Sequence, residues 1–288
     1  MVVSNNFNNR IMVELGKINT LDVVRETDNG FYLDGGDLGE ILMPRKFITD
    51  EVRATMKATV FVYTDSEDRL VATTEKPLVK VGEFAFLKVE EVTRFGAFLD
   101  WGLPKHLLVP FSEQRAKMVE GRSYLVYVYV DLHSNRIAAS AKINKYLDNT
   151  PPDYAVGQEV QLLIAEETEL GYKAIVNGEH WGILYHDQLF QQVTPGQQLT
   201  GYVNKIRTDE KIDLLLQKPG YAKVDDISEK ILEELRNNRG FIAVSDDTSP
   251  EMIKAMFGIS KKSFKKALGS LYKQKLISFE SDGIRLMK

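Results

Sequence analysis

Hydrophobic and polar positions alternate in short β-type runs through most of the chain, and three stretches repeat one pattern. Each stretch begins with a glycine, continues with a short apolar strand and a polar turn, and ends with a second apolar strand. The three stretches are Gly30–Pro44, Gly96–Pro110 and Gly171–Tyr185, the last of which fits more loosely. Because an internal sequence repeat is the signature of a repeated structural unit, the pattern predicts three versions of one unit.

Each stretch is followed by a β-rich run that a charged turn interrupts. Valine, isoleucine, tyrosine and phenylalanine, which favour strands, dominate these runs. The runs are Val60–Thr73, Tyr124–Ser140 and Leu199–Leu216. Each unit therefore provides about five strands in about 70 residues, which is the size and strand count of an OB fold, a small barrel whose exposed face commonly binds oligonucleotides.

The spacing of apolar residues becomes helical from Asp226 onward. Two serines in capping positions predict two further helices, and a two-stranded hairpin follows them. The predicted elements are a helix from Asp226 to about Asn237, a short helix after Ser249 that stops at Gly258, a helix from Ser260 to about Lys273, and strands Leu276–Glu280 and Ile284–Met287. This order is that of a winged helix-turn-helix, in which the second helix of the turn motif usually enters a groove of nucleic acid.

The length of 288 residues is about twice that of a usual domain, so the chain should divide into several compact units. We predict a mainly β, multidomain fold of three tandem five-stranded OB barrels followed by an α+β winged helix-turn-helix. The predicted domains are residues 1–78, 79–146, 147–223 and 224–288, and Pro151–Pro152 marks the linker before the third barrel.

Composition narrows the cellular setting. Cysteine is absent, which excludes disulfides and thiolate metal sites and fits a reducing compartment. The N-terminal segment has neither a basic leader nor an apolar core, and the longest apolar run, Tyr124–Val130, is far shorter than the roughly 20 residues that span a bilayer. We therefore expect a cytoplasmic protein with no membrane partner.

The net charge of −4 argues against nucleic acid as a partner, since phosphate binding depends on lysine and arginine. The charge is unevenly divided, however, because the four predicted domains carry −4, +3, −5 and +2 in chain order. Positive charge is therefore concentrated in the second barrel and in the winged helix.

The second unit carries the clearest motif. Its segment Val89–Asp100 contains Phe95-Gly96-Ala97-Phe98, and Leu108–Ser112 follows at the next strand. This segment resembles the ribosomal S-one (S1) type of RNA-binding OB motif. The first and third units share the glycine and the strand rhythm, so their likeness to that motif depends on their being repeats of the second.

The resemblance implies a binding face with two aromatic side chains beside the glycine, a histidine on the third strand, and an Asp and an Arg at the last hairpin. The second unit matches with Phe95, Phe98, Asp131 and Arg136 and has Pro110 in place of the histidine; the first offers Asn29, Tyr32, Pro44, Asp65 and Arg69; the third offers Leu170, Lys173, Tyr185, Asp209 and Lys211. The candidate RNA-binding residues are Lys88, Arg94, Phe95, Phe98, Asp131, Arg136, Tyr32, Arg69, Tyr185 and Lys211.

Phe95 and Phe98 are three residues apart, a spacing that a regular strand would place on opposite faces. Gly96 permits a bulge or a break that would bring both rings to one side. Stacking of a base on each ring could then contribute about 1 to 3 kcal/mol to the binding free energy. The alternative interpretation is that one of the two phenylalanines belongs to the barrel core.

Seven lysines and no acidic residues lie between Lys254 and Lys275. The candidate nucleic-acid contacts in the winged helix are Lys254, Lys261, Lys262, Lys265, Lys266 and Lys273. Lys261 and Lys262 fall in the first turn of their helix, where the helix dipole destabilises a cation by roughly 0.3 to 1 kcal/mol. A phosphate ligand would explain why lysines occur at this unfavourable position. The alternative is a solvated lysine face on a winged helix that contacts protein.

The order of three OB-like units and a winged helix, with Ser249–Ile277 as its most specific segment, resembles the bacterial conserved virulence factor B family. This resemblance spans nearly the whole chain. It implies an RNA-binding regulator of gene expression, of the virulence-regulator type, with no catalytic activity or cofactor. Base stacking on the second barrel adds the expectation that the RNA partner is single-stranded.

The residues themselves show no catalytic motif. None of His106, His133, His180 and His186 has a metal-binding spacing, and neither a phosphate-binding glycine loop nor a nucleophile elbow is present. We therefore predict a non-enzymatic protein with no metal, cofactor or small-molecule substrate. Two other hypotheses stay open: a winged-helix transcriptional regulator that binds DNA, and an adaptor that docks on the ribosome or polymerase.

Overall fold

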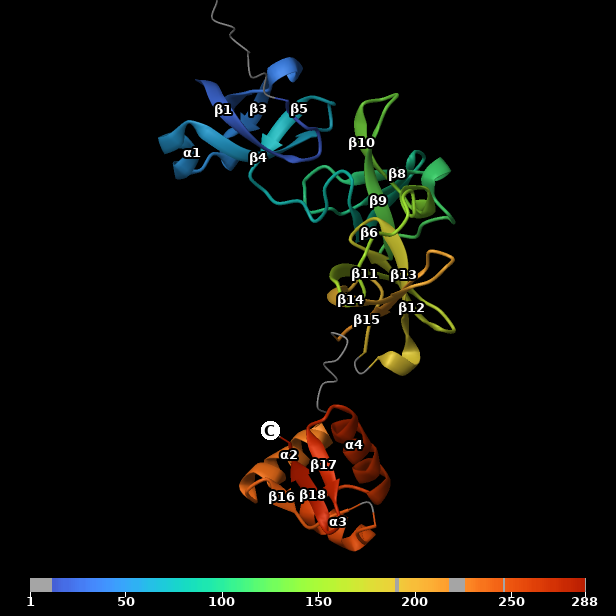
Figure 1. The fold of residues 1–288 in the computed structure, drawn as a ribbon. Helices are drawn as coiled ribbons and strands as arrows, with labels where there is room; N and C mark the ends of the chain where they lie inside the picture. The colour runs from blue at the N-terminus through green and yellow to red at the C-terminus, as the bar shows by residue number, and fades with distance from the viewer. Residues whose placement is uncertain (1–11, 190–191, 218–225, 246, 288) are drawn as a thin grey trace, which may run out of the picture. The chain divides into compact units, whose positions relative to one another are not determined.

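The computed structural model describes residues 12–189, 192–217, 226–245 and 247–287. Within these residues the chain forms three closed β-barrels, followed in sequence by a domain of three helices and a small sheet (Figure 1). The predicted mainly β, multidomain fold with OB barrels and a winged helix is thereby confirmed.

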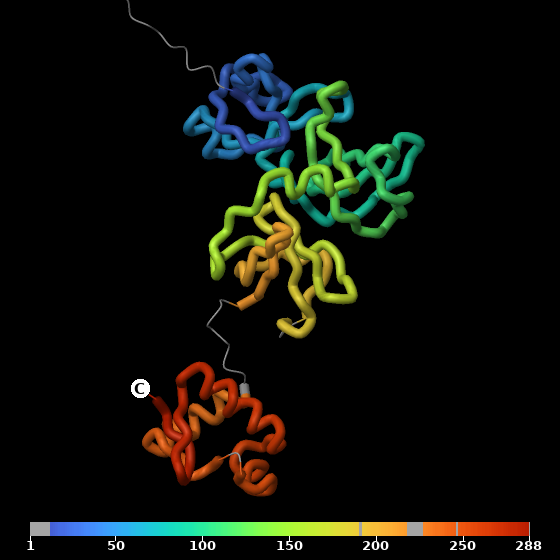
Figure 2. The backbone as a smooth tube through the Cα atoms, turned by 45° about the vertical axis from the view of Figure 1, so that its right-hand side comes forward, coloured from blue at the N-terminus to red at the C-terminus, as the bar shows by residue number. Residues whose placement is uncertain are grey.

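Each barrel is closed and has five strands, and the three barrels are formed by successive stretches of the chain (Figure 2). The first contains β1 (Ile18–Thr27), β2 (Gly30–Asp34), β3 (Glu40–Pro44), β4 (Lys57–Thr64) and β5 (Leu70–Thr73); the second contains β6 (Phe84–Thr93), β7 (Gly96–Leu99), β8 (Leu107–Pro110), β9 (Ser123–Asp131) and β10 (Arg136–Ser140); the third contains β11 (Glu159–Glu167), β12 (Gly171–Val176), β13 (His180–Tyr185), β14 (Gln198–Ile206) and β15 (Ile212–Leu215). Around every barrel the hydrogen-bonded order is first, second, third, fifth and fourth strand, which is one topology used three times.

Short helical segments connect the strands. The α-helix α1 (Asp50–Thr55) follows β3, with Thr49 as its N-cap. The 3-10 turns are Gly36–Leu38, Arg45–Phe47, Phe111–Glu113, Ile143–Tyr146 and His186–Gln188. A 3-10 turn follows the third strand of every barrel directly, and in the first barrel α1 comes after that turn.

The repeated glycine has a structural reason that is the same in each barrel. Gly30, Gly96 and Gly171 begin the second strand with φ of +145°, +148° and +157°, and a Cβ there would lie 2.1, 2.2 and 1.9 Å from a carbonyl oxygen of the third strand. These glycines pair with Pro44, Pro110 and Tyr185, the last residues of the three aligned stretches. The sequence repeat is therefore a repeat of strand register, and a side chain is excluded at its first position.

A β-bulge lies in the first strand of each barrel, between Val23 and Arg25, between Val89 and Glu91, and between Ile164 and Glu166. Such a bulge increases the local twist and lets one long strand pair with both of its neighbours, which closes the barrel. The bulge that we expected at Gly96 therefore lies on the opposite strand, β6.

The hydrophobic core of the second barrel continues into the first. Phe61 and Tyr63 of β4 pack with Trp101, which follows β7, at ring-centroid distances of 5.6 and 6.4 Å. All three side chains are buried and belong to one apolar cluster with Leu99 and Val109 of the second barrel. These two barrels therefore share part of their core.

The C-terminal domain has the predicted winged-helix order. Its elements are α2 (Asp226–Asn237), β16 (Phe241–Ile242), α3 (Pro250–Phe257), α4 (Lys261–Lys273), β17 (Ile277–Glu280) and β18 (Gly283–Leu286). Ser249 and Ser260 accept hydrogen bonds from the backbone N–H groups of Met252 and Ser263, so both predicted N-caps are present. The sequence did not predict β16, which pairs with β18 at the edge of a three-stranded sheet.

Candidate nucleic-acid interface

The third barrel has a cleft of about 760 Å³, within the range of sites that hold small ligands. Its walls include the five residues that the S1-type pattern placed on the binding face of this barrel, namely Leu170, Lys173, Tyr185, Asp209 and Lys211. They come from the β11–β12 loop, from β12, from β13 and from the β14–β15 loop. The third unit departs furthest from the S1-type sequence pattern, yet the structure brings all its corresponding positions to one cleft.

Strand β13 supplies the ring-bearing wall of the cleft. His180 and Leu184 are buried, whereas Trp181, Ile183 and Tyr185 are half-buried and line the cleft, as the period-two alternation of a strand requires. The Lys173 ammonium lies 3.8 Å from the centroid of the Trp181 ring, within cation–π distance. Sequence reasoning missed Trp181, although its even spacing from Tyr185 was a signal that could have found it.

A polar network fixes the Tyr185 ring. Arg207, which also lines the cleft, donates from Nη2 to the Tyr185 hydroxyl and from Nε to Asp213 Oδ1 at 3.0 Å, and the Tyr185 hydroxyl donates to the same Asp213 oxygen at 3.2 Å. Burial, followed by the negative charge of Asp213, raises the pKa of Tyr185. The hydrogen bond to Asp213 raises the pKa of Arg207. The ring is thus held in place before any ligand binds.

The segment before the third barrel forms another part of the cleft wall. Asp148 Oδ1 accepts a hydrogen bond of 2.9 Å from the Trp181 backbone N–H, and a ring nitrogen of buried His180 lies 2.7 Å from the Thr150 carbonyl oxygen. Asp148, Thr150 and Pro152 all line the cleft. The predicted Pro151–Pro152 linker therefore begins in a segment that packs against β13.

The charges around the cleft are mixed. Lys211 forms an ion pair of 2.9 Å with Asp209, and this hydrogen bond lowers the pKa of Asp209. Glu169 and Glu210 also line the cleft. Since acids balance its cations, this cleft offers flat rings to a ligand more than it offers positive charge.

The first barrel has a groove of smaller volume on the same face. A groove of about 660 Å³ is lined by Asn29, Tyr32 and Arg69, three of the five positions expected there. The Arg25 guanidinium covers the Tyr32 ring at 3.9 Å from its centroid, and Arg69 forms ion pairs with Asp65 at 2.7 Å and with Glu67. The candidate groups of this barrel are therefore engaged within it.

In the second barrel, the two candidate phenylalanines both lie outside the core. Phe95 is 59% exposed in the turn before β7, and Arg94 lies over its ring at 4.7 Å. Phe98 is half-buried on β7 between the buried Ala97 and Leu99. The interpretation that one of these rings belongs to the core is therefore wrong for Phe95, and Phe98 faces away from the buried side of its strand.

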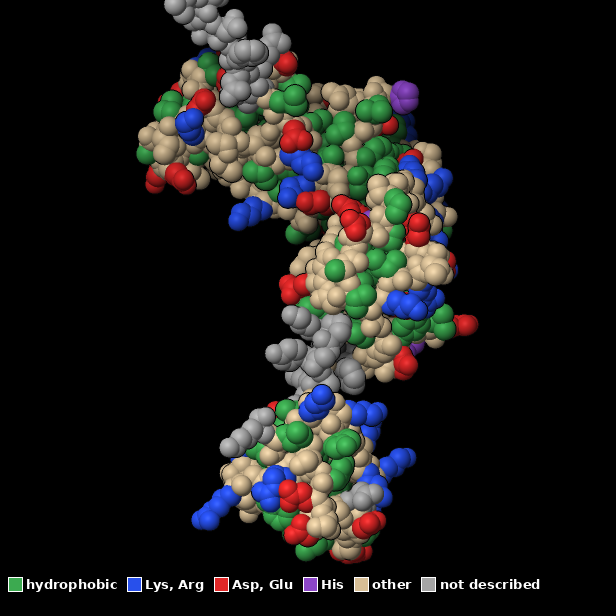
Figure 3. All heavy atoms as spheres, in the orientation of Figure 1, with side chains coloured by type: hydrophobic (Ala, Val, Ile, Leu, Met, Phe, Trp, Pro, Cys, Tyr) green, Lys and Arg blue, Asp and Glu red, His purple; other side chains and the backbone are tan. Residues whose placement is uncertain are grey.

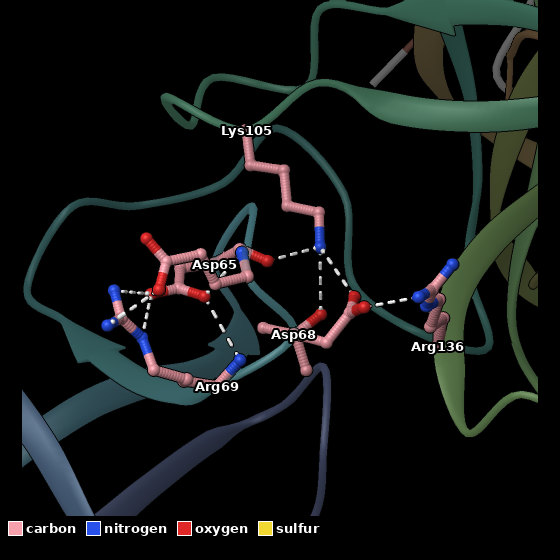
Figure 4. Close-up of polar contacts among 7 residues, drawn as sticks. Asp65, Asp68, Arg69, Lys105 and Arg136 are labelled. Carbon is pink, nitrogen blue, oxygen red and sulfur yellow. Dashed lines mark hydrogen bonds and ion pairs between the residues drawn. The ribbon is translucent and has the colours of Figure 1, made fainter.

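Three charged candidates of the second barrel have structural partners, and Figure 4 shows the partner of one of them, Arg136. Arg136 forms an ion pair with Asp68 in the β4–β5 hairpin of the first barrel, and Lys105 also approaches Asp68, at 3.5 Å. Lys88 pairs with Glu90 at 2.7 Å. Asp131 accepts hydrogen bonds from Ser134, which lower the pKa of Asp131 and close its hairpin. The sequence motif pointed to the exposed Phe95 ring but could not show these ion pairs.

The winged helix presents its candidate lysines to solvent. Lys254, Lys262, Lys265, Lys266 and Lys273 are exposed and Lys261 is half-buried, while Phe264, Ala267, Leu268 and Leu271 on the opposite side of α4 are buried. In the space-filling view, Lys and Arg side chains project from this domain around hydrophobic patches (Figure 3). The lysine face of α4 therefore does not contribute to the core.

The described part of the chain has neither a candidate metal-binding cluster nor a helix that could span a membrane. It contains no cluster of three or more His, Asp or Glu side chains that could hold a metal ion. None of its helices combines the length and the apolar character needed to span a bilayer.

Three OB barrels, a cleft that exposes aromatic rings and a winged helix with a lysine face define a multidomain protein of the nucleic-acid-binding class. A family model for the S1 domain matches residues 15–75, and one for the CvfB-like winged helix domain matches residues 229–286. The S1 match lies on the first barrel, whereas the motif that we recognised lies in the second. Domains of these two kinds are typical of nucleic-acid binding and not of catalysis.

The similarity extends along the chain. The chain is 28% identical over 291 aligned residues to conserved virulence factor B of Staphylococcus saprophyticus, and the alignment covers 94% of both sequences. It is 26% identical to conserved virulence factor B of Staphylococcus aureus, covering 95% of this chain and 94% of the relative. The resemblance to this family is thus confirmed over nearly the whole length. A solved structure described as a multidomain protein with nucleic acid binding domains, from Streptococcus pneumoniae, matches 95% of this chain and 98% of its own, with 24% identity and a TM-score of 0.40.

Proposed function

We propose that this protein is an RNA-binding regulator of gene expression whose third barrel holds unpaired bases in its cleft. The observation that carries the proposal is the convergence of Lys173, Trp181 and Tyr185 on one preformed cleft. Flat rings held by a polar network stack on bases with about 1 to 3 kcal/mol each and with little sequence preference. Bases in single-stranded RNA are free to enter such a cleft, whereas those of a duplex are already stacked.

The proposal assigns base contacts to the third barrel and phosphate contacts to the winged helix. The cleft has balanced charges, so phosphate contacts fall to the lysines of α4, which face solvent. Two modules on one chain raise each other's effective concentration, so a weak base-binding site and a weak phosphate-binding site together bind tightly. Phe95 and Phe98 of the second barrel add a further surface on which bases can stack.

Intrinsic fluorescence provides a direct test of this cleft. The chain has two tryptophans, of which Trp101 is buried at 2% exposure and Trp181 lines the cleft. Titration with a mixed-sequence 20-nucleotide RNA is expected to quench the emission of Trp181, because a stacked base lies against its ring. The Trp181→Phe variant should show no quenching. Quenching that persists in this variant, or a wild-type emission that RNA leaves unchanged, would contradict the proposed site.

The pairing of Arg136 with Asp68 leads to a second prediction. Asp68→Asn removes the carboxylate that neutralises this guanidinium, so the affinity for single-stranded RNA should rise by up to about five-fold at low salt. The slope of log K against log salt should steepen by about 0.7, the value for one more phosphate contact. Polarisation titrations at several salt concentrations measure both quantities.

Asp28→Asn provides the matched control, because Asp28 is another exposed acid of the first barrel and the substitution changes the charge equally. Equal affinity gains in both variants would mean that only net charge matters. In that case Arg136 would not be a phosphate contact.

The exposed lysine face of α4 also favours a second candidate function, binding of duplex DNA by the winged helix. Competition distinguishes the two functions. Under our proposal, unlabelled single-stranded RNA displaces labelled RNA at far lower concentration than duplex DNA of the same sequence does.

A further inference from the structure

The groove of the first barrel is lined mainly by apolar side chains. The apolar members are five of its eight lining residues, namely Tyr32, Leu38, Leu42, Leu70 and Val71. Leu38 is 41% exposed in the turn before β3, and the other two leucines and the tyrosine are half-buried. Exposed apolar side chains that gather around a hollow, rather than lying singly on the surface, mark a surface for a partner.

The common strand register allows this groove to be compared, position by position, with the cleft of the third barrel. Glu40 lies four residues before the end of β3, and Trp181 lies four residues before the end of β13. Both strand ends pair with the repeated glycine, so the two positions correspond. Glu40 lines the groove as Trp181 lines the cleft. The first barrel therefore has a carboxylate where the third barrel has its stacking ring.

Two arginines at the groove are already neutralised by acids of the same barrel. Arg25 Nη2 donates a hydrogen bond of 2.7 Å to Glu40. Arg69 donates from Nε and Nη2 to Asp65 at 2.8 and 2.7 Å (Figure 4), and it also pairs with Glu67 at 2.9 Å. The hydrogen bonds to these carboxylates raise the pKa of Arg25 and the pKa of Arg69. A phosphate group would have to displace a carboxylate from either guanidinium, so nucleic acid is a poor ligand for this groove.

The rim of the groove adds further negative charge. Asp34 lies directly opposite Glu40 in the β2–β3 pair, and the exposed Asp37 precedes Leu38. Asp28 is exposed and precedes another lining residue. Residues 1–78 carry a net charge of −4, whereas residues 79–146 carry +3. An apolar floor within an acidic surface complements a ligand that is both apolar and cationic.

We infer that the groove of the first barrel docks a segment of a partner protein in which apolar side chains lie next to arginine or lysine. The apolar side chains pack on Leu38 and Leu42, and the cations lie near Asp34 and Asp37. This role goes beyond the proposed function, in which the other domains hold the RNA. One chain then connects a bound RNA with a basic protein through sites on different domains.

The test uses the full chain and a fluorescein-labelled peptide of alternating leucine and arginine as the probe. Two matched peptides accompany it, one with glutamate in place of arginine and one with serine in place of leucine. Polarisation titrations should show binding of the leucine–arginine peptide and no binding of the glutamate peptide. The Kd of the serine peptide should be at least about ten-fold higher, because its apolar contacts are lost.

Variants within the groove locate the site. Leu38→Ser/Leu42→Thr removes two apolar side chains from the groove and should raise the Kd of the leucine–arginine peptide by about ten-fold or more. Asp34→Asn/Asp37→Asn leaves the apolar floor intact and should raise the same Kd by about five-fold at low salt and by less at high salt. Both variants should bind single-stranded RNA as the wild type does.

Two control variants change the same barrel outside the groove. Met56→Ala removes an apolar side chain that is 47% exposed, and Asp50→Asn/Glu51→Gln removes two exposed acids of α1. None of these residues lines the groove, so both variants should bind the leucine–arginine peptide as the wild type does.

The inference is overturned if the wild-type chain does not bind the leucine–arginine peptide, if the glutamate peptide binds equally well, or if both groove variants keep the wild-type affinity. It is also overturned if the α1 variant loses as much affinity as the groove variants do, since only net charge would then matter. Loss of RNA affinity in the groove variants would make the groove a nucleic-acid site and overturn it as well.

Two further readouts keep the outcome decisive. Circular dichroism shows whether each variant folds, and the aspartate variant, which keeps every apolar side chain, decides the outcome if the leucine variant does not fold. Failure of the proposed function is a separate result. A wild-type chain that binds the leucine–arginine peptide and no RNA loses the proposed function and keeps the docking groove.

Discussion

Replacing Trp181 and Tyr185 together by alanine is expected to weaken binding of single-stranded RNA by about 25-fold or more. Each ring contributes at least about 1 kcal/mol to base stacking, and the two lie on the same face of β13. The salt dependence should be retained, because neither substitution removes a cation. Polarisation titrations of the full chain against labelled 20-nucleotide RNA measure both quantities.

Two controls accompany this prediction. Trp181→Phe keeps an aromatic ring and should retain most of the affinity. Phe111→Ala removes a ring that is 48% exposed in the second barrel and lies outside the cleft, so it should have no effect on RNA binding. A double variant that binds RNA as the wild type does would remove the third barrel from the proposed function.

The Gly171→Ala substitution is expected to lower the free energy of unfolding by about 2 to 4 kcal/mol. A methyl group there would lie 1.9 Å from the Leu184 carbonyl oxygen, at a φ of +157° that L side chains rarely adopt. The oxygen belongs to the paired strand β13, so relief requires the two strands to separate. Urea unfolding, followed by circular dichroism, measures the loss.

Gly178→Ala provides the matched control in the same hairpin. Gly178 has φ +75°, but a Cβ there would have no atom within 4 Å. Its substitution should therefore cost only the strain of a left-handed conformation, about 1 to 2 kcal/mol. Equal losses in the two variants would show that the contact with Leu184 does not determine the stability of the barrel.

The fold was largely predictable because its determinants are local or repeated. The glycine-led stretches gave the strand register of all three barrels, and Ser249, Gly258 and Ser260 gave the limits of two helices, since each acts on the backbone within one turn. The strand β16 was missed because two residues carry no periodic pattern. The bulges in the first strands were missed because they depend on closure of the barrel.

The candidate site was less predictable for a related reason. The exposure of Phe95 followed from a local motif, but the pairing of Arg136 with Asp68 joins residues far apart in the sequence. The third barrel departs most from the S1-type pattern, and only the folded chain shows that Trp181 and Arg207 complete its cleft. The second barrel has the clearest S1-type motif, whereas the third barrel has the cleft that gathers the corresponding positions.

The common strand register has a consequence for how such a chain can diversify. The contact between the repeated glycine and the neighbouring carbonyl is made by backbone, and it specifies nothing about the side chains that point outward. One scaffold can therefore be copied along a gene while each copy acquires its own surface chemistry. Transferring a surface chemistry to another barrel would then require the outward-facing side chains of all the elements that line the cleft, β12, β13 and the two neighbouring loops, without redesigning the barrel that receives them.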